Sequence, residues 1–83
     1  MPTITVHDIV ALTQDIEARE FMTDVSILLR RGQVGTVVEE YDDGTAFEVE
    51  FSGSTGQPYA LLAIPAEQLM PLYYQAVYLN PAS

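Results

Sequence analysis

The sequence predicts an all-β domain folded as a small barrel of about five strands. Three observations predict it. Short runs rich in β-branched and aromatic residues recur along the 83-residue chain. Turn sequences that contain glycine separate most of these runs, and one run alternates strictly between aromatic or aliphatic and acidic residues. Short, closely spaced strands joined by such turns favour a small barrel over layers of helices and sheet.

Five runs are predicted as strands, at residues 3–12, 36–41, 47–51, 57–64 and 69–72. Gly32 and Gly35 lie in the turn predicted before the second strand, and Asp42-Asp43-Gly44-Thr45 predicts a tight hairpin after it, because Asp and Gly tolerate positive φ. In the third strand Phe47, Val49 and Phe51 alternate with glutamates, so the apolar side chains are expected to point inward. A single helical turn at residues 65–68 and an edge position for the last strand, which contains Pro71, complete the prediction.

Residues 15–30 interrupt this pattern and permit two interpretations. Apolar residues lie at the spacing of an amphipathic helix, at Ala18, Phe21, Met22, Val25, Leu28 and Leu29. The competing interpretation makes residues 24–29 a strand with Val25, Ile27 and Leu29 on one face. We expect a partly helical insertion between the first and second strands.

The charge balance excludes several classes of partner. Twelve acidic residues face three arginines and no lysine, which gives a formal net charge of -9. Nucleic acids and anionic membranes bind basic surfaces, so neither is expected as a partner. The sequence shows no long apolar segment and no basic leader with a hydrophobic core, and we therefore expect a cytoplasmic protein.

Composition also points to self-association. A domain of this length buries a modest core, and disulfide bonds cannot stabilise it because there is no cysteine. The hydrophobic fraction is 48%, and no charge follows Glu67. We predict a barrel domain at residues 1–72 and a C-terminal extension at 73–83 that is buried in a homo-oligomer. The predicted interface residues are Phe21, Val25, Leu28, Leu29, Tyr73, Tyr74, Val77, Tyr78 and Leu79.

Several segments together resemble a bacterial family of domains of unknown function, number 4926. They are residues 8–13 (DIVALT), 30–41 (RRGQVGTVVEEY), 47–51 (FEVEF), 59–64 (YALLAI) and 68–72 (QLMPL). The resemblance spans about residues 7–72 and implies a Src-homology-3-like barrel without an assigned activity. The chain departs from the family pattern in a longer connection through residues 17–29 and in the tail after Leu72, and both additions are apolar.

The densest cluster of functional groups is acidic and lies around the predicted hairpin. Its members are Glu39, Glu40, Asp42, Asp43, Glu48 and Glu50. A solvated strand face, a docking site for a basic partner protein and a site for a hard cation are all compatible with this cluster. The spacing of the carboxylates matches no known cation loop, so no metal and no cofactor is expected.

No residues are arranged for catalysis. His7 and Asp8 are neighbours on a predicted strand, where adjacent side chains point to opposite faces, and Ser52 and Ser54 lie in a turn without the context of a nucleophile elbow. The sequence predicts a non-enzymatic binding or structural module that forms a homo-oligomer and binds a protein partner. The alternative is a small-molecule or cation sensor that uses the acidic hairpin or an intersubunit pocket.

Overall fold

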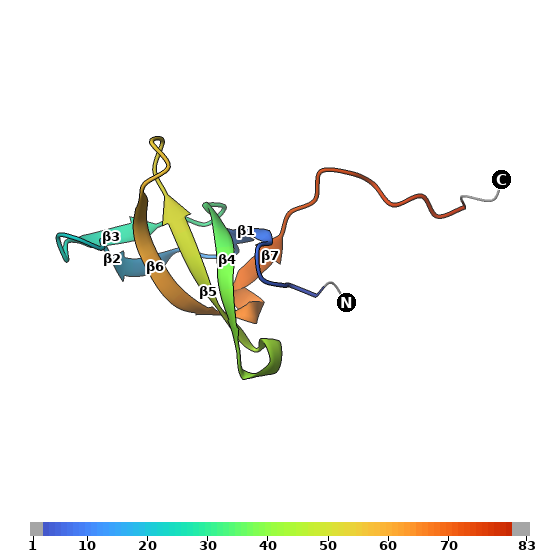
Figure 1. Cartoon of the computed structure of the whole chain (residues 1–83), viewed down its shortest axis with the longest axis horizontal. Coiled ribbons are helices and arrows are strands. Elements are labelled where there is room, and N and C mark those ends of the chain that lie inside the picture. Colours follow the sequence, from blue (N-terminus) through green and yellow to red (C-terminus); the bar gives the residue numbers. More distant parts are fainter. Residues whose placement is uncertain (1–2, 81–83) are drawn as a thin grey trace.

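The computed structural model describes residues 3–80 and shows an all-β domain from which the C-terminal segment extends (Figure 1). The strands are β1 (Ile9–Leu12), β2 (Ile16–Arg19), β3 (Ser26–Leu29), β4 (Val34–Tyr41), β5 (Ala46–Ser52), β6 (Pro58–Pro65) and β7 (Leu69–Pro71). Two single turns of 3-10 helix, η1 (Asp42–Gly44) and η2 (Ala66–Gln68), connect β4 to β5 and β6 to β7. The prediction of an all-β fold is confirmed.

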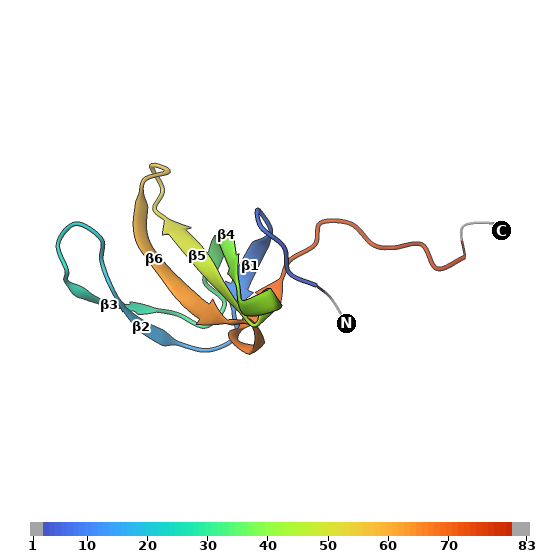
Figure 2. The same cartoon turned by 60° about the horizontal axis from the view of Figure 1, so that its bottom comes forward.

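Five of the strands form one antiparallel sheet in the order β6-β5-β4-β1-β7. These are the five strands predicted from the sequence, with shifted ends. The sheet is strongly curved (Figure 2), but within residues 3–80 β6 and β7 are edge strands that do not pair with each other. The structure therefore has a curved open sheet where a closed barrel was expected.

The core lies on the inner face of this curved sheet. Phe47, Val49 and Phe51 of β5 are almost completely buried, as the alternation in the sequence predicts. They pack in one cluster with apolar residues of β1, β4, β6 and β7. Leu29 at the end of β3 belongs to the same cluster and is only 1% exposed.

Gly35 lies inside β4, not in the preceding turn where the sequence analysis placed it. It pairs with Val10 of β1, on the side of β4 away from β5. A Cβ atom at this position would lie 2.7 Å from Val49 Cγ1 and 2.9 Å from both Phe51 Cε1 and the Glu50 carbonyl oxygen. Glycine therefore allows β4 to approach β5 closely, which supports the curvature of the sheet.

The insertion contains no helix. Residues 16–19 and 26–29 form the two-stranded hairpin β2–β3, with Ala18 opposite Ile27. The helical interpretation was wrong and the strand interpretation was nearer, although β3 begins at Ser26 and Val25 is exposed. The inner face of the hairpin packs on the core, so contact with the sheet decides the conformation of this segment.

The first strand is shorter than predicted, because residues 5–8 form a turn. His7 has a φ of 80°, and the backbone N–H of Thr5 donates a 2.9 Å hydrogen bond to Asp8 Oδ2. The backbone N–H of His7 donates to the Val37 carbonyl, which ties the turn to β4. The pairing of β1 with β4 begins only at Ile9.

Residues 72–80, which we call the arm, follow β7 and leave the body of the domain (Figures 1 and 2). The arm contains no strand and no helix, and its large apolar side chains are 71–94% exposed from Tyr73 to Leu79. The predicted extension continues to Ser83, but residues 81–83 lie outside the described part of the chain. In residues 3–80 we find no helix with the length and apolar character needed to cross a membrane.

Candidate functional site

A pocket of about 640 Å³ lies at the end of the sheet where β4 turns into β5. The η1 turn, the η2 turn and the N-terminal segment come together there (Figures 1 and 2). We call this feature the acid-rimmed pocket. Its lining residues are Thr3, Ile4, Glu40, Asp43, Gly44, Thr45, Phe47, Ala66, Glu67, Leu69 and Pro71.

The floor of the pocket is apolar and belongs to the core. Phe47 of β5, Leu69 of β7 and Ile4 of the N-terminal segment are all buried, and Ala66 of η2 is half-buried. Three separate parts of the chain thus supply the floor. Since these side chains are fixed by core packing, the pocket is preformed and does not require a ligand to open it.

The rim carries three exposed carboxylates, on Glu40, Asp43 and Glu67. Glu40 reaches the rim because β4 has a β-bulge between Val37 and Glu39, which shifts the strand by one residue. After the bulge Glu40 pairs with Phe47, and directly opposed residues share a face of the sheet. The bulge therefore moves the Glu40 side chain to the face that holds the pocket.

The η1 turn places the second carboxylate. Asp42, Asp43 and Gly44 all have positive φ, at 50°, 55° and 85°. Aspartate is one of the few residues other than glycine that enter this region readily, so the predicted tight turn is confirmed with the residues that it requires. The left-handed backbone at Asp43 positions this residue at the pocket, and Gly44 and Thr45 continue the rim.

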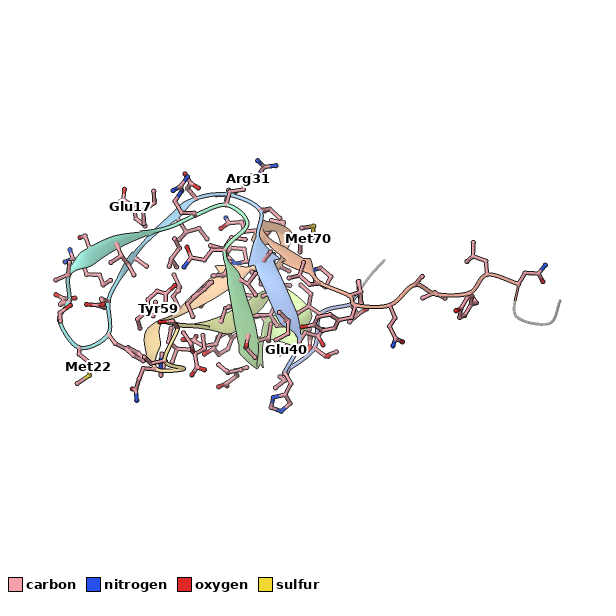
Figure 3. The ribbon with its side chains drawn as sticks, turned by 90° about the horizontal axis from the view of Figure 1, so that it is seen from above. Glu17, Met22, Arg31, Glu40, Tyr59 and Met70 are labelled. Atoms are coloured by element: carbon pink, nitrogen blue, oxygen red, sulfur yellow. The ribbon has the colours of Figure 1, made fainter. Side chains whose placement is uncertain are left out.

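No cation neutralises this rim within residues 3–80. Glu40, Asp43 and Glu67 take part in none of the ion pairs or side-chain hydrogen bonds found in that range. The arginines lie elsewhere. Arg31 precedes β4 at its opposite end, and Figure 3 shows it well separated from Glu40.

Another arginine, Arg19, is engaged at the hairpin. Arg19 of β2 forms an ion pair with Asp24, with 3.8 Å between Nη1 and Oδ2, and donates a 3.0 Å hydrogen bond to the Asp24 carbonyl. Both side chains are largely exposed. The arginines therefore lie at the hairpin and before β4, away from the unneutralised carboxylates at η1.

The other hairpin carboxylates form a separate group. Glu39 pairs with Glu48, on the face of β4 and β5 opposite to Glu40 and Phe47. The Tyr41 hydroxyl donates a 2.9 Å hydrogen bond to Glu48 Oε1. This bond raises the pKa of Tyr41 above its ordinary value of 10.0, with further contributions from partial burial and the charges of Glu48 and Glu39.

The six acidic candidates are thus divided between two faces and the turn. Glu40 and Asp43 line the pocket, Glu39 and Glu48 lie opposite each other on the outer face, Glu50 pairs with Thr36, and Asp42 is exposed in η1. Among residues 3–80 no three Asp, Glu or His side chains come close enough together to hold a metal ion. The acidic hairpin therefore offers no geometric support for the cation-sensor alternative.

The predicted interface residues lie in two regions. Phe21, Val25 and Leu28 are about half exposed on the hairpin, and the other group is on the arm. Leu29 is a correction, because it is buried in the core of its own chain and is not available to a partner. Glu67 and Ile4 also line the pocket, and neither was predicted from the sequence as a site residue. Glu67 is the last charge before the uncharged C-terminal stretch, and this isolation was the one signal that could have identified it.

Comparison with known proteins identifies a family and no annotated relative. No curated protein and no solved structure matches the chain. Residues 6–71 match the sequence profile of a domain of unknown function, DUF4926. This range covers all seven strands, both η turns and most residues of the acid-rimmed pocket, and it ends where the arm begins. The chain therefore belongs to the DUF4926 family.

Proposed function

We propose that this domain is a binding module without a catalytic role, which docks a basic segment of a partner protein at the acid-rimmed pocket and also self-associates. The observation that carries the docking proposal is the combination of a preformed apolar floor with three carboxylates that no cation neutralises within residues 3–80. Arginine and lysine side chains combine an aliphatic stem with a charged head. The stem of one such side chain can pack on the apolar floor while its head pairs with the rim carboxylates.

Electrostatics favour a basic protein over other ligands. The net charge of -9 attracts cationic segments from a distance and raises the rate of encounter. Because the rim carboxylates are exposed, each ion pair is worth on the order of 1 kcal/mol or less and is weakened by salt. Affinity must therefore come from burial of the aliphatic stem together with several weak pairs, and a guanidinium fits best because it can bind carboxylates in a bidentate way.

A pair of short peptides tests this proposal. We expect acetyl-Leu-Arg-Leu-Arg-amide to shift the amide resonances of Gly44, Thr45 and Glu67 in the full chain, and the citrulline analogue, which keeps the shape without the charge, to bind at least about tenfold more weakly. The double variant E40Q/E67Q should weaken binding of the arginine peptide several-fold.

The matched control removes one carboxylate elsewhere. Glu17 is exposed on the outer face of the hairpin, so E17Q changes the net charge without touching the pocket. Equal binding of the arginine and citrulline peptides, or a weakening by E17Q as large as that by E40Q/E67Q, would contradict docking at the pocket.

Self-association is supported by the arm. Its three tyrosines, together with Val77 and Leu79, are exposed to water in a single chain, and burial of such side chains against protein is favourable by about 25 cal/mol per Å². Light scattering should give a mass above that of one chain for the full sequence and the mass of one chain for a version ending at Leu72. A single-chain mass for both versions at high concentration would refute this part of the proposal.

A further inference from the structure

Among the elements of residues 3–80 that lack a pairing partner are the outer edge of β3 and the arm. We infer that residues 73–79 of one copy add as a third strand to the edge of β3 in a second copy, and that two copies exchange arms in this way. The inference rests on the self-association part of the proposed function and specifies its contact.

The edge of β3 is open. In the described part of the chain the hairpin is a two-stranded sheet. The β2 side is next to β6, where the Phe21 N–H donates a 2.9 Å hydrogen bond to the Tyr59 carbonyl. The opposite side of β3 pairs with no strand within residues 3–80, so its backbone groups on that side can accept another strand.

This edge also lacks the usual protection against pairing. Exposed edge strands generally carry charged residues or proline, which prevent another chain from adding to them. The β3 sequence Ser-Ile-Leu-Leu contains neither, and Leu28 is 51% exposed on the outer face. A hairpin of two strands is marginally stable by itself and gains from a third strand.

The arm has the composition of a strand that is still unpaired. Tyrosine and valine favour β-structure, and the segment from Tyr73 to Leu79 contains no charge, glycine or proline. In an extended conformation Tyr73, Val77 and Leu79 would share one face. Backbone hydrogen bonds to β3 would supply affinity, and the apolar face would cover the exposed residues of the hairpin.

A second copy is the occupant that the geometry favours. The arm leaves the body on the side opposite to the hairpin in both views (Figures 1 and 2), and the molecule is 56 Å long in its longest direction. The seven residues 73–79 reach roughly 23 Å when extended, at about 3.3 Å per residue. In two copies that lie side by side in opposite directions, the arm of each copy can pair with the β3 edge of the other. This arrangement gives a closed, twofold dimer.

Cross-linking between single-cysteine variants tests this contact, because the chain has no cysteine of its own. One copy carries Leu28→Cys and the other, isotopically labelled, carries Val77→Cys. After mixing and treatment with a short bismaleimide, we expect a cross-linked product of one labelled and one unlabelled chain. Val34→Cys is the matched control, since Val34 of β4 is also 51% exposed, and it should give at most a tenth of that product with Val77→Cys.

These experiments distinguish failure of the β3 contact from failure of self-association. A dimer seen by light scattering in which Leu28 and Val34 cross-link equally would overturn the β3 site and leave self-association standing. A single-chain mass for the unmodified protein would overturn both. The variant Leu28→Lys places a charge on the edge, and we expect it to keep the circular dichroism spectrum of the folded domain while losing the dimer. A dimer that survives this substitution with an unchanged dissociation constant would also overturn the β3 site.

Discussion

Replacement of Gly35 by alanine tests the close approach of β4 and β5 that shapes the sheet. The new methyl group would lie within 2.9 Å of three atoms, on Val49, Phe51 and the Glu50 backbone. Val49 and Phe51 are completely buried, and a backbone oxygen in a neighbouring strand cannot rotate away. Overpacking in cores costs about 1–3 kcal/mol, and we expect a loss near the upper end, about 3 kcal/mol.

Urea unfolding followed by circular dichroism measures this loss, with Gly53→Ala as the control. Gly53 lies in the β5–β6 turn without a positive φ, and the nearest atom to an added Cβ is 4.0 Å away on Tyr59. Alanine there should leave stability unchanged or raise it by about 0.4–1 kcal/mol. The melting temperature of Gly35→Ala should fall by roughly 12–24 °C, at about 4–8 °C per kcal/mol. A loss below about 1 kcal/mol at Gly35 would show that the sheet does not depend on this contact.

Three further predictions concern side chains outside the core. Glu48→Gln should lower the pKa of Tyr41 toward 10.0, because the carboxylate that accepts its hydrogen bond is lost; NMR titration of the tyrosine ring carbons measures the change, and an unaltered pKa would contradict the assignment. Since the folded state holds the phenol proton more tightly, the stabilisation by this contact is present below about pH 10 and is lost as the pH rises through the raised pKa. Asp43→Val should destabilise the domain by about 1–2 kcal/mol and Asp43→Asn much less, because φ is 55° at this position; equal urea midpoints would argue against a left-handed turn in solution. Arg19→Ala should change stability by less than about 0.5 kcal/mol, because the pair with Asp24 is exposed; a thermal shift of many degrees would indicate an additional contact.

Most of the main sheet could be predicted from the sequence because its signals are local. The alternation through Phe47, Val49 and Phe51 directly reports which face of β5 is buried. The Asp-Asp-Gly sequence indicates a turn with positive φ, and Pro71 indicates an edge strand. Each of these features is caused by one residue and its immediate neighbours, so the sequence contains enough information to specify it.

The acid-rimmed pocket could not be predicted, because it depends on a bulge that the sequence does not mark. Regular alternation from the buried Val37 would place Glu39 on the inner face and Glu40 on the outer face. The bulge at Val38 reverses this assignment, and it is the pairing with β5 that reveals it. Glu67 joins the rim from η2 only after β6 has returned along the sheet, which is a contact between distant parts of the chain.

The insertion was predicted incorrectly because its apolar residues fit two periods. Ala18, Val25 and Leu29 suit one face of a helix, whereas Ile27 and Leu29 suit one face of a strand. The structure selects the strand, since the inner face of the hairpin packs on the core and the tip bonds to β6 through Phe21. These stabilising contacts are tertiary, and a local pattern contains no information about them.

The proposed basic partner and the proposed self-association place different demands on so acidic a chain. Two bodies with a net charge of -9 repel each other, so a contact between them must avoid the carboxylates. The arm and β3 contain no charge, and the acid-rimmed pocket lies at η1, away from the hairpin. Salt should therefore act on the two contacts in opposite directions: it weakens attraction at the pocket, while it screens the repulsion between two bodies and strengthens the apolar contact. Binding of the arginine peptide and the dissociation constant of the dimer, measured at several salt concentrations, must show slopes of opposite sign if the pocket binds through charge and the arm through burial of apolar surface.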